Sequence, residues 1–100
     1  QAAWVSTTGL VEEIIVYASV DTVLVKLSVP GVAVPTCSDA TMFAISGSLP
    51  PERRGQLLAV LTSAQAREAS VTISYDNAGG CVQWDTTPNV YRAITRVTVR

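Results

Sequence analysis

Runs of apolar residues, either alternating with polar ones or nearly continuous, predict three β-strands in the first half of the chain. The expected strands are 10–17, 22–29 and 41–46. The first two are rich in β-branched residues, which favour extended backbone. The stretch 30–35 between them and the third strand is bracketed by Pro30 and Pro35. Proline cannot donate a hydrogen bond within a sheet, so we expect a loop there.

The second half of the chain begins with a helix, which we predict over 51–69. Its apolar stripe follows the three-and-four spacing of an α-helix, with Leu57, Leu58, Leu61 and Ala64. The opposite face carries the small residues Ala59, Ser63 and Ala66. This face is either plain monomer surface or a place where another helix approaches closely. Strands at 71–75 and 92–99 follow the helix, with a short β-segment at 81–84 between them.

This order of elements predicts the fold class. Three strands, one helix and two strands in about a hundred residues is the order of the OB-fold, a five-stranded Greek-key barrel. We therefore predict a single all-β domain over residues 1–100, with one α-helix between strands 3 and 4. The expected core is Ile14, Val16, Val23, Val25, Leu27, Phe43, Ile45, Leu57, Leu61, Ile73 and Val97.

Composition and charge limit the function. Hydrophobic residues make up 48% of the chain and charged residues 15%, which favours burial of some apolar surface against further copies. The net charge is −1 and the arginines are scattered, so we expect no nucleic-acid partner. The chain has no histidine, the usual general base and the commonest metal ligand. We expect no enzyme activity, no metal and no cofactor.

Two cysteines bear on the cellular compartment. Two cysteines form one bridge in an exported chain and remain buried thiols in a cytosolic one. Their positions beside the third and fourth predicted strands favour a Cys37–Cys81 disulfide. The sequence starts at Gln1 rather than methionine, which indicates either that a targeting segment has been removed or that the sequence has been trimmed. Together these features predict a secreted or periplasmic protein.

Several segments resemble a known group of proteins. They are GLVEEIIVY, VLVKLSV, MFAIS after Cys37, the helix segment LLAVLTSAQA, and VTISYD followed by a glycine-rich loop holding Cys81. Over about residues 9–99 this arrangement resembles small exported bacterial OB-fold proteins, the B subunits of subtilase cytotoxin and typhoid toxin. The resemblance implies a homopentamer with the face of Ala59, Ser63 and Ala66 toward a central pore. It also implies a toxin A subunit as partner and binding to sialylated glycans on host cells.

The resemblance places a glycan site just before and along the first strand. The candidate residues there are Trp4, Ser6, Thr7 and Thr8. Thr7 aligns with a serine of the toxin subunits, and the tyrosines next to that serine in the typhoid subunit are missing here. Trp84, with Tyr75 and Tyr91, is a second candidate aromatic platform for a sugar, or these residues cap the barrel or pack against the disulfide.

Two functions therefore stay open: a glycan-binding toxin subunit, and an exported envelope protein with a structural or interaction role and no sugar site. Ser38 and Asp39 carry a hydroxyl and a carboxylate, but the chain offers no histidine base beside them. We interpret them as turn residues.

Overall fold

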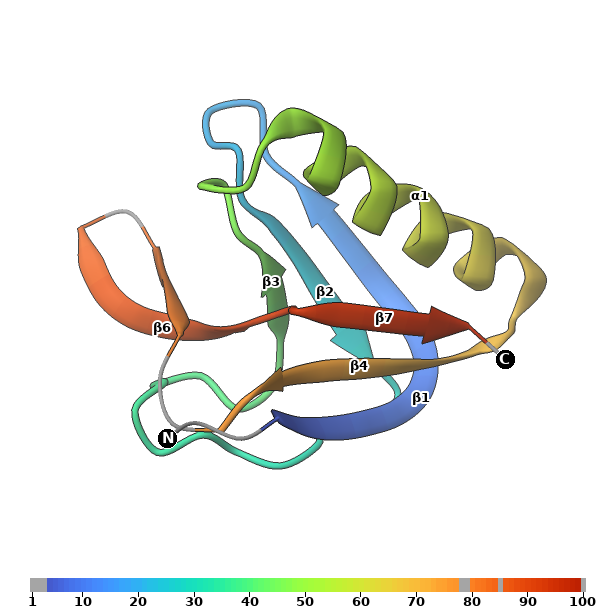
Figure 1. Ribbon diagram of the computed structural model, residues 1–100, viewed down its shortest axis with the longest axis horizontal. Helices are drawn as coiled ribbons and strands as arrows, with labels where there is room; N and C mark the ends of the chain where they lie inside the picture. The colour runs from blue at the N-terminus through green and yellow to red at the C-terminus, as the bar shows by residue number, and fades with distance from the viewer. Residues whose placement is uncertain (1–3, 78–79, 85, 100) are drawn as a thin grey trace.

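The computed structural model describes residues 4–77, 80–84 and 86–99, and within these ranges it is a β-rich fold with one helix (Figure 1). The elements in chain order are β1 (Trp4–Val16), β2 (Val23–Leu27), β3 (Phe43–Ile45), α1 (Pro51–Arg67), β4 (Ser70–Asp76), β5 (Cys81–Trp84), β6 (Thr87–Ala93) and β7 (Arg96–Val99). The predicted β-rich fold with a single helix is confirmed. The described chain forms seven strands, two more than the five of the predicted barrel.

All seven strands belong to one sheet, in the order β5-β6-β3-β2-β1-β4-β7. The long β1 organises this sheet because its two halves pair with different neighbours. Its first half, from Trp4 to Leu10, is antiparallel to β4, and its second half, from Val11 to Val16, is antiparallel to β2. A register shift between Val11 and Glu13 marks the change of partner. Such irregularities increase the bend of a strand, and β1 curves around one side of the molecule (Figure 1).

The C-terminal segment also changes partner, and it forms two strands where one was predicted. β6 runs parallel to β3, whereas β7 runs antiparallel to β4. The change occurs at two consecutive residues. The N–H of Ile94 donates to the carbonyl of Ala44, and the N–H of Thr95 donates to the carbonyl of Ser74, both at 2.9 Å. The predicted β-segment at 81–84 is present as β5.

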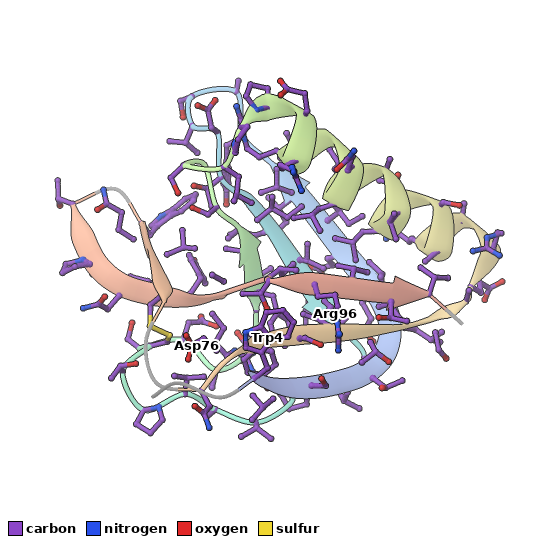
Figure 2. The ribbon with its side chains drawn as sticks, in the orientation of Figure 1. Trp4, Asp76 and Arg96 are labelled. Carbon is purple, nitrogen blue, oxygen red and sulfur yellow. A yellow bond between two sulfur atoms is a disulfide. The ribbon has the colours of Figure 1, made fainter. Side chains whose placement is uncertain are left out.

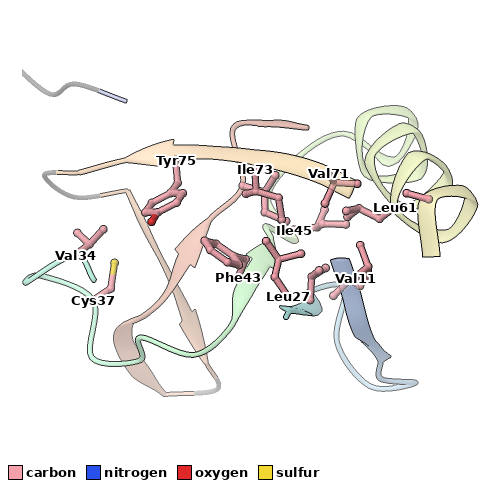
Figure 3. Close-up of a cluster of buried hydrophobic side chains, with 14 residues drawn as sticks. Val11, Leu27, Val34, Cys37, Phe43, Ile45, Leu61, Val71, Ile73 and Tyr75 are labelled. Atoms are coloured by element: carbon pink, nitrogen blue, oxygen red, sulfur yellow. The ribbon is translucent and has the colours of Figure 1, made fainter. Parts of the chain in front are cut away.

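The core lies inside the curved sheet, with β4 on one side, β2 and β3 on the other, and α1 at one end (Figure 3). Its buried side chains include Val11, Leu27, Phe43, Ile45, Leu61, Val71, Ile73 and Tyr75. Of the predicted core, Ile14, Leu57 and Val97 are only partly buried. Val16 is 64% exposed, so its assignment to the core is wrong. Val16 is the last residue of β1, and it lines a surface cavity together with Pro51 and Gly55 of α1, so the helix does not cover its side chain.

The helix presents one face to the core and the other to solvent. Leu61 and Ala64 are fully buried, whereas Ala59, Ser63 and Ala66 are exposed. The helix ends at Arg67, two residues before the predicted end, because Glu68 adopts a left-handed conformation with φ 55°. None of the described residues forms a helix long and apolar enough to cross a membrane.

The predicted disulfide between Cys37 and Cys81 is present, with 5.6 Å between the two Cα atoms. It joins the long loop between β2 and β3 to the start of β5. Cys37 is buried within the core. The bridge therefore holds a segment without regular structure against the sheet.

Candidate functional site

The outward face of the first half of β1 carries three of the predicted site residues. Side chains alternate between the two faces of a strand, so Trp4, Ser6 and Thr8 share one face. All three are exposed, and Trp4 exposes 54% of its surface. A tryptophan in that position offers an apolar ring and an N–H donor to solvent.

Hydroxyl groups pair across the boundary between β1 and β4 on this face. The hydroxyls of Ser6 and Ser74 are 2.9 Å apart, and those of Thr8 and Thr72 are 2.8 Å apart. Each pair consists of directly opposed residues in the antiparallel register. Cross-strand pairs of this kind stabilise the sheet, and the exposed members keep further hydrogen-bonding capacity toward solvent.

Arg96 of β7 completes the cluster around Trp4 (Figure 2). Arg96 lies opposite Ser74 in the register, and its Nη2 donates to the Ser74 hydroxyl at 3.3 Å. The guanidinium carbon is 5.2 Å from the centroid of the Trp4 ring, within the range of a cation–π contact. Ser74 on the central strand of the three is completely buried.

The cluster also includes a carboxylate. Asp76, the last residue of β4, is the partner of Trp4 in the register between β1 and β4 (Figure 2). The face formed by β1, β4 and β7 thus combines an indole ring, a guanidinium, a carboxylate and hydroxyls. We call Trp4, Ser6, Thr8, Asp76 and Arg96 the Trp4 surface.

Thr7 does not belong to the Trp4 surface. It points to the opposite face of β1, where it is buried, and its hydroxyl is 3.0 Å from the hydroxyl of Tyr75. Tyr75 donates to the carbonyl of Val32 at 2.7 Å, so Thr7 is the donor toward Tyr75. This chain of hydrogen bonds ties the loop before β3 to the sheet. The structure thus gives Thr7 a place in the fold's interior and not on an open surface.

Trp84 and Tyr91 lie in a separate aromatic cluster. Together with Tyr17 they form edge-to-face contacts, with ring centroids 4.9 Å apart for Tyr17 and Trp84 and 5.8 Å apart for Trp84 and Tyr91. The cluster packs against a small second core containing Leu24, Ala44 and Val82. Burial raises the pKa of Tyr91, and the negative charge of Asp39 adds to this effect. The predicted site residues therefore fall into two groups on different strands, with Thr7 apart from both.

Arg92 is a buried charge that the sequence did not single out. Only 1% of its surface is exposed. Its guanidinium donates to three backbone carbonyls, those of Pro30 at 2.7 Å, Val32 at 3.1 Å and Met42 at 3.3 Å, and lies 4.0 Å from the centroid of the Phe43 ring. Burial lowers the pKa of Arg92. Arg92 is the partner of the inward-facing Phe43 in the register between β3 and β6. Only knowledge of this strand pairing would have predicted that Arg92 is buried.

Asp39 forms a turn, as predicted. Its Oδ1 accepts hydrogen bonds from the backbone N–H groups of Thr41 and Met42 and from the Thr41 hydroxyl, at 2.8 to 2.9 Å. Burial by itself would raise the pKa of Asp39. These hydrogen bonds and the charge of Arg92 outweigh burial and lower the pKa. The carboxylate is thus held by its own turn.

In the part of the chain that the structure describes, no three histidine, cysteine, aspartate or glutamate residues lie close enough together to hold a metal ion. Comparison with protein-family models, with curated proteins and with solved structures found no match. The Trp4 surface is therefore interpreted from its own chemistry.

Proposed function

We propose that this protein is a non-enzymatic glycan-binding module and that the sugar binds at the Trp4 surface. The observation that carries the proposal is the half-exposed Trp4 ring beside Arg96 and a row of hydroxyls. One face of a pyranose ring is apolar and stacks on an aromatic side chain, while its hydroxyls need donors and acceptors at the edges. Arg96 supplies donors, and Ser6 and Thr8 supply both donors and acceptors.

The proposal extends to the type of fold. We regard β6 and β7 as two halves of one strand, which would make the sheet an OB-type barrel of five strands plus the short β5. Two observations support this interpretation. β6 is parallel to β3 while β7 is antiparallel to β4, and the hydrogen bonds of Ile94 and Thr95 to these two strands follow each other directly.

Assembly and location are further parts of the proposal. We propose a homopentamer in which Ala59, Ser63 and Ala66 face a central pore, since these small residues are exposed on α1. The disulfide supports an oxidising compartment, either the periplasm or the cell exterior. A toxin A subunit would be the partner of such a ring, and host-cell glycans would be its ligands. Light scattering tests the assembly, and a monomer at micromolar concentration contradicts it.

A glycan array on the purified, folded protein tests the function. Trp4→Ala should weaken binding about five- to tenfold, because loss of a stacking contact costs about 1–1.4 kcal/mol. Arg96→Gln should also weaken binding. Trp84→Phe is the matched control, because it changes an aromatic residue of the other cluster and should leave binding intact.

A second function follows if the folded oligomer binds no glycan on the array. The protein would then be an exported envelope protein with an interaction role. Exposed apolar residues in the loop after β2 favour this alternative, since Val32 is 56% exposed and Val29 is 41% exposed. Loss of binding in Trp84→Phe with retention in Trp4→Ala would instead move the sugar site to the other aromatic cluster.

A further inference from the structure

A groove of about 850 Å³ lies between α1 and the junction of β6 and β7, away from the residues of the Trp4 surface. This volume is typical of small-molecule sites. One wall is a single face of the helix, because Arg53, Gln56, Leu57 and Val60 follow the helical period. The groove is thus a built feature of the contact between helix and sheet.

The body of the groove is aliphatic. Leu57 and Val60 of α1 face Val82, Ile94 and Val97 from the strands. Val60 leaves 39% of its surface exposed at this groove. None of the described lining residues is aromatic, so they offer no platform on which a sugar or a flat ring would stack. An alkyl chain is the group that such a lining accommodates best.

The end of the groove next to the turn between β3 and α1 is polar and positively charged. Ser46, Ser48 and Arg53 lie there, and among the residues that the structure describes Arg53 is the single charged one in the lining. Arg53 forms no ion pair within the described ranges. Its neighbour Arg54, by contrast, is 3.7 Å from the carboxylate of Asp21. The groove therefore combines an aliphatic body with one uncompensated positive charge.

We infer that this groove binds an elongated aliphatic molecule with one carboxylate group. The alkyl chain lies on Leu57, Val60 and Val97, and the carboxylate faces Arg53. A cationic ligand finds no acidic partner among the described residues of the lining. This site is separate from the Trp4 surface and does not depend on the proposed glycan function.

The test is a titration of the whole protein with decanoate below its micelle concentration, followed by amide NMR shifts. We expect saturable shifts at Leu57, Val60 and Val97. Arg53→Gln should weaken decanoate binding about two- to fivefold, the effect of one exposed ion pair. Arg67→Gln, on the last turn of the same helix, is the matched control and should bind as the wild type does. Decanol, which has no charge, should bind equally to the wild type and to Arg53→Gln.

A second variant keeps the test decisive. Val60→Glu places a carboxylate in the groove at an exposed position, so it should abolish decanoate binding without unfolding the protein. Equal binding of decanoate to the wild type and Arg53→Gln would overturn the proposal, as would shifts centred outside the groove. It would also be overturned if Val60→Glu reduced the mass of an oligomer while decanoate failed to bind the wild type. The groove would then be covered by a second copy of the chain.

Discussion

Replacing Arg92 with methionine tests whether a buried charge stabilises this fold. Two effects oppose each other. Burial of the guanidinium is unfavourable, as its lowered pKa indicates, and apolar replacements of buried ion pairs are often neutral or stabilising. Here, however, the partners are backbone carbonyls of Pro30, Val32 and Met42, which no side-chain substitution removes.

The structure decides which effect is larger. In Arg92→Met the carbonyl of Val32 keeps the hydrogen bond from Tyr75, while those of Pro30 and Met42 lose their guanidinium donor. Two unpaired carbonyls cost about 1–3 kcal/mol each, and loss of the contact with the Phe43 ring costs about 1–2 kcal/mol. The variant no longer buries a charged guanidinium, and this gain offsets part of the loss in the free energy of unfolding. We expect the free energy of unfolding to fall by about 3 kcal/mol.

Urea denaturation followed by circular dichroism measures this change. Arg92→Lys keeps the charge but not the forked geometry, so it should lose about half as much. Arg67→Met is the control on an exposed arginine and should shift the free energy of unfolding by less than about 0.5 kcal/mol. An Arg92→Met protein as stable as the wild type, or more stable, would refute the reasoning.

Three further predictions concern stability. Reducing the disulfide should lower the free energy of unfolding by about 4 kcal/mol, since the bridge spans 44 residues; a loss below about 1 kcal/mol in a reductant-dependent melt contradicts this. The folded protein lowers the pKa of Asp39, so its ionised carboxylate stabilises the fold above the unfolded pKa of about 3.9, and this stability is lost as the pH falls through the folded pKa. In Asp39→Asn the free energy of unfolding, measured by denaturation at several pH values, should therefore fall less steeply as the pH is lowered. An unchanged pH dependence would argue against this role. Gly31→Ala should lower the free energy of unfolding, measured in urea, by about 1–3 kcal/mol, because Gly31 has a φ of +77° and a Cβ there meets the Thr7 side chain. Gly55→Ala is the control: a Cβ at this helix position has open space around it, so the change should be neutral or stabilising.

The sequence predicted those elements whose periodicity is local. Leu57, Leu61 and Ala64 mark the helix face without any knowledge of the sheet, and the helix begins where it was expected. The alternation in β2 and β4 likewise placed Val25 and Ile73 in the core. The disulfide was predictable because only two cysteines exist and both lie beside predicted strands.

Elements that depend on tertiary pairing were missed. The polar residues Ser6 and Thr8 lack apolar alternation, so the first strand was predicted to begin only at residue 10, yet pairing with β4 extends it back to Trp4. The break between β6 and β7 arises from hydrogen bonds to two different strands. Arg96 was not predicted as a neighbour of Trp4, because only the order β1-β4-β7 brings the start of β1 close to the start of β7.

Thr7 shows why the placement of hydroxyls decides how binding experiments should be interpreted. Ser6, Thr7 and Thr8 carry the same chemical group, but the period of two in a strand sends Thr7 inward and its neighbours outward. The Thr7 hydroxyl supports Tyr75 and through it the loop at Val32. A Thr7→Ala protein that loses glycan binding would therefore reflect a disturbed fold, and its free energy of unfolding would fall as well. A Ser6→Ala protein that loses binding while keeping its stability would point to the surface itself, so only the outward-facing hydroxyls test a sugar contact.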